Sequence, residues 1–298
     1  MSLKSRELLA DVSLLGISVI WGVTFLMVQD AIKEVPVFAF LFWRFLLATV
    51  LFFLIGIALK PNFDLPSIKA GAILGVMFCL AFSLQTFGLE HSLSSVVGFI
   101  TGLNVVFVPL FLWMLFSQKQ TPFALLGIAL AVLGLWMVST NGGGIGLGKG
   151  ELLTLGCAAL FALHIVYTGI FSKRHRLFPL ILAQFSTATL LCLLFSLLFD
   201  PFTIPSTLSY PFLKALFITA LFATVLAFLV QTYMQRFTTP AKTAVIFTME
   251  PVSAGIFGYF YAGEPLGSVQ ILGAGIIVLA MLSVELGSLL YRRKKRLN

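Results

Sequence analysis

The chain has 298 residues, of which 59% are hydrophobic and only 10% are charged, and its mean hydropathy is +1.06. This balance excludes an ordinary soluble domain and is typical of a protein that crosses a membrane several times. The formal net charge is +8, but the basic residues are dispersed over the ends of apolar stretches. The charge therefore favours a membrane topology over nucleic-acid binding.

Ten long apolar stretches follow one another, joined by short connections. Each has about 19 to 25 residues, enough for a helix to cross the hydrocarbon layer and too many for a transmembrane strand. The predicted helices are 12–32, 36–59, 67–89, 94–116, 122–140, 150–171, 178–199, 211–234, 240–262 and 266–290. The first stretch is too long for a signal peptide, so we expect it to be retained. The sequence thus predicts an all-α polytopic membrane protein.

Most Lys and Arg residues fall at one end of this predicted bundle. With a cytoplasmic N-terminus, the cytoplasmic loops and ends carry Lys4, Arg6, Lys60, Lys69, Lys119, Lys173, Arg174, Arg176, Arg236, Lys242 and a basic tail. Lys33, Lys149 and Lys214 fall at the other end. Because Lys and Arg near helix ends resist translocation, the sequence predicts that both termini are cytoplasmic.

The two halves of the chain resemble each other weakly. One register superposes Gln85 on Gln231, and a second lays 16–25 over 156–165. Five helices per half is an odd number, so the second half must be inverted relative to the first. We expect a first repeat at 1–141, a glycine-rich external linker at 142–149, a second repeat at 150–290 and a basic cytoplasmic tail at 291–298.

Two inverted five-helix repeats are typical of transporters, which bind substrate near the midplane where the halves meet. The most telling residues are Trp21-Gly22, Arg44, Glu250-Pro251, the run Gly263-Glu264-Pro265-Leu266, and then Gln270, Gly273 and Gly275. On these residues, the whole chain resembles the drug/metabolite transporter superfamily, specifically its EamA-type ten-helix permeases. The resemblance implies export of small metabolites, often amino acids or their analogues, across the bacterial inner membrane.

Three ionisable side chains lie deep in the predicted helices, where each needs a partner or a role. Glu250 is interpreted either as a cation or proton site or as a structural acceptor beside Pro251. Arg44 either faces a central cavity and attracts a carboxylate or phosphate, or extends to the outer surface. His164 is a candidate for ligand contact or proton relay, with a helix-to-helix hydrogen bond as the alternative.

Further candidates for substrate binding follow from the pairing of the two repeats and from the depth of residues in the predicted membrane helices. Asn104 is the repeat mate of Glu250, and Thr24 is the mate of His164. The aromatic candidates for a cavity wall include Trp21, Phe25 and Tyr167. Gln85 and Gln231 are nearer to helix ends, and we expect structural bonds from both.

Two prolines interrupt helices that correspond in the repeat. Pro109 lies in the fourth predicted helix and Pro251 in the ninth. A proline frees a carbonyl and permits bending, which makes these helices candidates for gating elements, with a static kink as the alternative.

The three cysteines stand singly, and the sequence contains no paired carboxylates, metal-ligand spacing or nucleotide-binding motif. We therefore expect no enzyme activity, no metal and no cofactor. The expected partners are a small-molecule substrate, the lipid bilayer and, in a coupled mechanism, protons. The sequence leaves open an uncoupled facilitator or channel, a carrier of lipid-linked or amphiphilic substrates, and the choice between monomer and homodimer.

Overall fold

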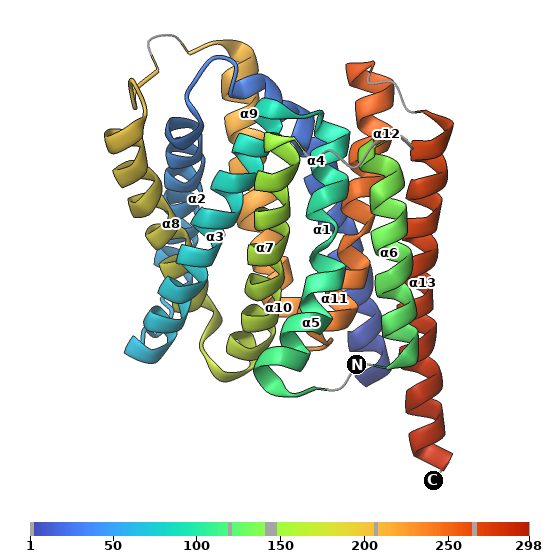
Figure 1. Cartoon of the computed structure of the whole chain (residues 1–298). Coiled ribbons are helices and arrows are strands. Elements are labelled where there is room, and N and C mark those ends of the chain that lie inside the picture. Colours follow the sequence, from blue (N-terminus) through green and yellow to red (C-terminus); the bar gives the residue numbers. More distant parts are fainter. Residues whose placement is uncertain (1–2, 119–120, 141–147, 206–207, 264–266, 298) are drawn as a thin grey trace.

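The structure is a computed structural model that describes residues 3–118, 121–140, 148–205, 208–263 and 267–297 (Figure 1). These residues form a single bundle of helices. They are α1 (Leu3–Ala31), α2 (Val37–Leu59), α3 (Leu65–His91), α4 (Ser94–Thr101), α5 (Asn104–Phe116), α6 (Pro122–Thr140), α7 (Lys149–Arg174), α8 (Leu177–Phe199), α9 (Tyr210–Ala220), the π-helical turn η1 (Leu221–Leu226), α10 (Ala227–Met234), α11 (Pro240–Phe247), α12 (Met249–Ala262) and α13 (Ser268–Leu297). The predicted linker lies mostly outside the described residues.

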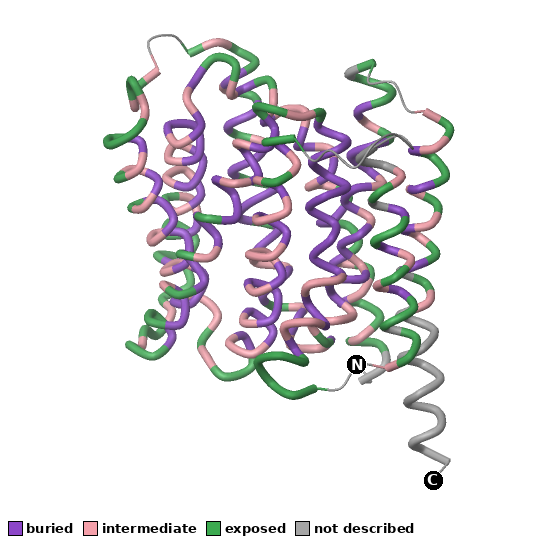
Figure 2. Tube along the Cα trace, viewed as in Figure 1, coloured by how far each residue is buried: buried purple, intermediate pink, exposed green. Residues whose placement is uncertain are grey.

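Eight helical segments are long and apolar enough to cross a membrane. They are Ser5–Ala31, Val37–Leu59, Leu65–His91, Ser94–Phe116, Lys149–Arg174, Leu177–Phe199, Tyr210–Met234 and Pro240–Tyr261. The apolar segments of α6 and α13, Leu125–Gly134 and Ser268–Ala280, are shorter. Several positions of α8 are exposed (Figure 2), and they include Leu190, Leu194, Leu197, Leu198 and Phe199. Lipid accommodates such a surface, so the chain is a multi-pass membrane protein.

Two of the predicted helices, the fourth and the ninth, are interrupted, and the eighth runs without a gap through the π-helical turn η1. The ninth breaks at Thr248 between α11 and α12, because Pro251 has no N–H to offer the carbonyl of Phe247 four residues earlier. That carbonyl instead accepts a 3.1 Å hydrogen bond from the hydroxyl of Ser18. The fourth breaks at 102–103, whereas Pro109 lies inside α5. The sequence had indicated a break at Pro109. The fourth helix breaks instead at 102–103, before this proline.

The helices of the two halves interleave. α2 packs on α8, where the hydroxyls of Thr49 and Thr189 lie 3.0 Å apart. The thiols of Cys79 in α3 and Cys192 in α8 lie 3.4 Å apart, and both cysteines are free and buried. α6 packs on α13 and α4 on α12. α1, α3, α7 and the broken helices surround the centre of the bundle (Figure 1).

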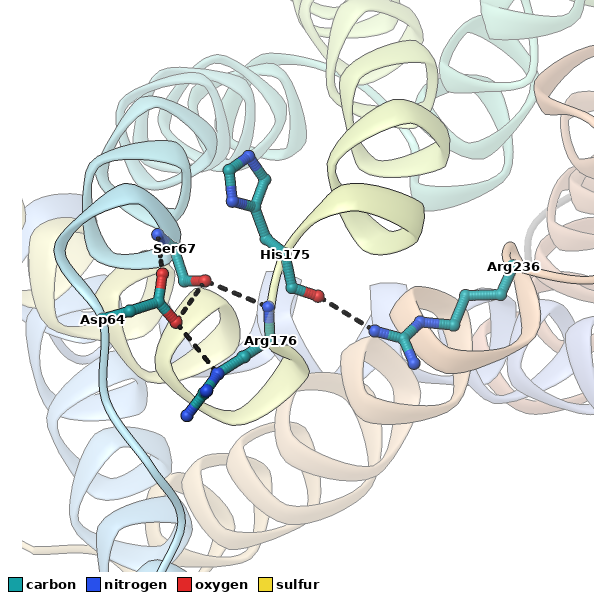
Figure 3. Close-up of polar contacts among 5 residues, drawn as sticks. All are labelled: Asp64, Ser67, His175, Arg176 and Arg236. Carbon is teal, nitrogen blue, oxygen red and sulfur yellow. Dashed lines mark hydrogen bonds and ion pairs between the residues drawn. The ribbon is translucent and has the colours of Figure 1, made fainter.

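The start of α1 and the end of α13 lie at the same end of the bundle, which we call the terminal end (Figure 1). Here Asp64 accepts the N–H of Ser67 at 2.9 Å, and the Ser67 hydroxyl accepts the N–H of Arg176 at 3.0 Å (Figure 3). The hydrogen bond from the Ser67 N–H lowers the pKa of Asp64. The Arg236 side chain donates to the carbonyls of Ser172 at 2.6 Å and His175 at 3.0 Å, which caps the last turn of α7.

Further contacts join the two halves at each end. At the terminal end, Nζ of Lys242 in α11 lies 2.8 Å from the carboxylate of Asp11 and 3.2 Å from that of Glu7 in α1. At the opposite end, the hydroxyl of Ser92 donates to the carboxylate of Glu151 in α7 at 2.6 Å. Polar contacts thus join the first and second halves at both ends of the bundle.

Candidate functional site

A cavity lies at the centre of the bundle, with a volume of about 40 Å³. This is room for a few water molecules. Its wall is formed by Trp21, Thr24, Phe25 and Val28 of α1, Arg44 of α2, Phe82, Gln85 and Leu89 of α3, Thr101 of α4, Asn104 of α5, Phe161, His164 and Ile165 of α7, Phe228 and Gln231 of α10, Phe247 of α11 and Glu250 of α12.

Arg44 is buried against neutral groups. Its Nε donates to the hydroxyl of Thr224 at 3.0 Å, and its Nη2 lies 3.5 Å from the carbonyl of Ala223. The guanidinium sits over the ring of Phe82, 4.6 Å from the centroid, a cation–π contact. Among the described residues, no carboxylate forms an ion pair with Arg44. The cavity wall therefore contains a buried guanidinium that has no ion-pair partner among the described residues.

Acceptor groups gather elsewhere on the wall. Glu250 is 6% exposed and reaches the cavity, and the described residues give its carboxylate no hydrogen bond or ion pair. The Oδ1 of Asn104 and the Oε1 of Gln231 are buried and also lack a partner within the described part of the chain. Three acceptor groups are thus available to a donor, and buried acceptors are rarely left unpaired in proteins.

His164 and Trp21 are held by neighbouring helices. The Nε2 of His164 lies 3.2 Å from the Oε1 of Gln184 in α8, and its Nδ1 lies 3.5 Å from the hydroxyl of Thr168. The Nε1–H of Trp21 donates to the carbonyl of Ala223 at 2.9 Å. Both rings therefore have fixed orientations. The remaining wall is aromatic, with Trp21 packed edge-on against Phe247 at 4.9 Å between ring centroids.

The wall residues come in pairs when the two halves are superposed. The first register pairs Phe82 with Phe228, Gln85 with Gln231 and Asn104 with Glu250; the second pairs Trp21 with Phe161, Thr24 with His164 and Phe25 with Ile165. Residues that the two sequence registers pair thus line the same cavity. Two charged-type residues, Arg44 from the first half and Glu250 from the second, make the two sides of the cavity chemically different.

Most of the candidates named from sequence lie on this cavity: Trp21, Thr24, Phe25, Arg44, Asn104, His164 and Glu250. Arg44 does not extend to the outer surface, because it is 3% exposed. Tyr167 lies elsewhere, against the apolar cluster of Ala70, Leu74 and Leu180. Tyr167 follows the cavity residue Ile165 by two positions, which is more than half a turn of an α-helix with 3.6 residues per turn, so its side chain lies on the opposite side from that of Ile165.

Sequence reasoning missed other members of the site. Gln85 and Gln231 line the cavity, although their position near helix ends had favoured structural bonds. Gln85 does make one, from its Nε2 to the hydroxyl of Thr101 at 3.2 Å. Ala223 and Thr224 hold Arg44 from the π-helical turn, and nothing in the run Leu221–Leu226 predicts such a turn. The repeat pairing of the two glutamines was the available signal for their place.

The comparisons with known proteins agree with a membrane transporter. The profile of the EamA-like transporter family matches residues 8–140 and again residues 148–285. An uncharacterized transporter of Archaeoglobus fulgidus is 31% identical over 287 residues, covering 94% of this chain and 87% of that protein. The chain belongs to the EamA-like transporter family.

Other relatives share the same length and class. The uncharacterized inner membrane transporter YedA of Escherichia coli K12 is 25% identical, over 95% of this chain and 92% of that protein. The uncharacterized transporter YetK of Bacillus subtilis is also 25% identical, over 93% and 86%. A crystal structure with a TM-score of 0.72 covers 93% of this chain and 97% of its own at 17% identity, which shows a shared fold.

Proposed function

We propose that this protein carries a small zwitterionic metabolite, such as an amino acid or a related compound, across the bacterial cytoplasmic membrane as an exporter. Transport proceeds by alternating access between two inverted repeats of five helices, with the terminal end in the cytoplasm. The observation that carries the proposal is the cavity, which presents an unneutralised Arg44 and an unpartnered Glu250. A guanidinium suits a carboxylate, and the acceptor oxygens of Glu250, Asn104 and Gln231 suit an ammonium.

The paired wall positions support the inverted repeats, and so do the helix contacts. α3 of the first half packs on α7 of the second, and the corresponding helices, α9–α10 of the second half and α1 of the first, also pack on each other. α1 packs on α12, and its counterpart α7 packs on α5 and α4. For each of these contacts, the corresponding helices of the opposite halves also pack on each other. The two matches to the family profile, one per half, support the same organisation.

The small size of the cavity supports alternating access. Its volume of about 40 Å³ is far below the ~300–1,000 Å³ of typical small-molecule pockets. The helices around the cavity must therefore rearrange to admit a metabolite. One partner of each end contact is related by the repeat, since Asp11 and Glu151 correspond in the register that pairs α1 with α7. The terminal end is held by an ion pair, and the opposite end by a hydrogen bond from a neutral hydroxyl.

Proton coupling is part of this proposal. Glu250 has no cationic partner among the described residues, so it can exchange a proton or an ammonium group with the cavity. An uncoupled facilitator would use the same fold without this exchange. Flux that responds to an imposed pH gradient distinguishes the two.

Counterflow in proteoliposomes tests the proposal. The purified protein is loaded with each amino acid in turn, and uptake of the labelled compound is followed with and without a pH gradient. We expect saturable counterflow that Arg44→Ala abolishes and Arg44→Lys weakens. The matched control is Arg174→Ala, an exposed arginine at the end of α7. Unchanged counterflow in Arg44→Ala, with normal amounts of folded protein, would refute the assigned role of the cavity.

A further inference from the structure

The segment Tyr210–Met234, which corresponds to the eighth predicted helix, changes its helical geometry beside Arg44. It passes from α9 through the π-helical turn at Leu221–Leu226 into α10. A π turn spaces its backbone bonds one residue further apart than an α-helix does, and such turns are frequent at functional sites. The hydroxyl of Thr224 donates to the carbonyl of Thr219, five positions earlier, at 2.9 Å. A side chain thus bridges the widened turn.

The same turn holds side chains from two other helices. The Thr224 hydroxyl accepts the Nε–H of Arg44 at 3.0 Å, while the Ala223 carbonyl accepts the Nε1–H of Trp21 at 2.9 Å. That carbonyl also lies 3.5 Å from Nη2 of Arg44. Both acceptors are neutral, so they orient the guanidinium without cancelling its charge. A hydroxyl can accept from Arg44 and donate to Thr219 at once, which couples the turn to the arginine through one oxygen.

The π turn has no counterpart in the described residues of the other half, and neither does the charge of Arg44. α2 and α8 correspond over Val37–Leu59 and Leu177–Phe199, which places Gln184 at the position of Arg44. The counterpart of the segment Tyr210–Met234 is α3, a continuous α-helix over Leu65–His91. Neutral Gln184 contacts His164 instead. The π turn therefore occurs in the half that faces the charged residue.

We propose that Thr224 is a positioning residue, which aims the Arg44 guanidinium at the anionic group of the transported metabolite. The proposal rests on the proposed function, since it assumes that Arg44 binds that group. Removing the hydroxyl frees Nε of Arg44 to turn toward other acceptors. The cavity then keeps the positive charge of Arg44, but the guanidinium no longer has a fixed orientation.

Three variants separate this role from a structural one. Thr224→Val removes the hydroxyl and keeps the shape, and Thr224→Ser keeps the hydroxyl. Thr232→Val is the matched control, because Thr232 is buried in α10 and its hydroxyl has no partner among the described residues. The first readout needs no ligand: the Nε–H resonance of Arg44 in protein labelled with ¹⁵N-arginine, in nanodiscs. We expect slow hydrogen exchange in wild type, Thr224→Ser and Thr232→Val, and fast exchange in Thr224→Val.

The second readout uses phenylalanine and phenylalaninamide, which lacks the carboxylate, as counterflow probes in proteoliposomes. Loss of a hydrogen bond to a charged group is expected to raise the KM for phenylalanine roughly ten- to a hundredfold in Thr224→Val. The KM for phenylalaninamide should not change, and Thr224→Ser should restore the wild-type value. Slow Arg44 exchange and unchanged KM in Thr224→Val, with transport lost in Arg44→Ala, would overturn this inference alone. Unchanged phenylalanine transport in Arg44→Ala would overturn the proposed function together with it.

Discussion

Arg44 and Glu250 are charged-type side chains that the bundle withdraws from water without pairing them to each other or to another ion among the described residues. Such groups are costly within a membrane. Arg44 is stabilised by Thr224, by the Ala223 carbonyl and by the ring of Phe82. Glu250 is left with the cavity alone. On our account, the substrate supplies the missing partners of both.

Glu250→Gln keeps the size of the side chain and removes its ability to ionise. We expect flux at least roughly tenfold lower, and no remaining response to an imposed pH gradient. The measurement is proteoliposome counterflow, with Glu90→Gln, an exposed residue near the end of α3, as the control. A Glu250→Gln protein that still responds to the gradient would show that the carboxyl does not couple protons.

Asp64 provides a pH test outside the membrane segments. The Ser67 N–H and hydroxyl, with Arg176 nearby, hold the pKa of Asp64 below its ordinary value of 3.8. A depressed pKa contributes stability above the ordinary value, and this contribution is lost as the pH falls through the lower, folded-state pKa. We expect Asp64→Asn to lower the melting temperature at pH 7, and the gap to wild type to close as pH drops below 3.8. Asp30→Asn is the control, and a gap that persists at low pH would contradict the assignment.

At the scale of elements, glycine sets how closely α1 approaches α12. A Cβ at Gly22 would collide with the hydroxyl of Ser253 and lie 2.7 Å from the N of Ala254. A Cβ at Gly16, in the same helix, would meet nothing within 4 Å. We expect Gly22→Ala to lower thermal stability and displace α12 with Glu250, whereas Gly16→Ala is neutral or slightly stabilising. Equal melting temperatures for the two variants would show that this contact is not tight.

The membrane helices could be predicted from sequence because a run of apolar residues leaves few other structures in lipid. Arg44, His164, Asn104 and Glu250 could be placed near the cavity because deep polar residues in such a chain are rare. Two local irregularities of the helices could not be predicted from the sequence. The π turn at Leu221–Leu226 has no composition signal, and the break at 102–103 precedes Pro109 instead of coinciding with it. Which face Tyr167 presents depends on neighbouring helices that the sequence does not locate.

At the scale of the whole molecule, the contacts at the two ends are unequal. Lys242 with Asp11 and Glu7 holds the terminal end, and a Ser92–Glu151 hydrogen bond holds the other. The ion pair is partly shielded, with the Lys242 side chain 13% exposed. We therefore expect the terminal end to be closed most of the time.

Lys242→Ser converts the terminal contact into the kind found at the opposite end. We expect several-fold to roughly tenfold faster labelling of a cysteine in the cavity from the terminal side, because a partly buried ion pair is lost. Lys33→Ser is the control, since its pair with Asp30 lies within one helix end and does not join the halves. Equal labelling rates in wild type and Lys242→Ser would show that this contact does not hold the end closed.

The most direct test of the account is two-sided access to the cavity wall. Thr24→Cys is introduced after the native cysteines have been replaced by alanine, and a membrane-impermeant maleimide is added from either face of sealed vesicles. We predict labelling from both sides, and loss of labelling from the terminal side alone when Asp11→Cys and Lys242→Cys are joined by oxidation before the maleimide is added. Labelling from one side only, or labelling from the terminal side that this cross-link does not change, would contradict alternating access through the cavity.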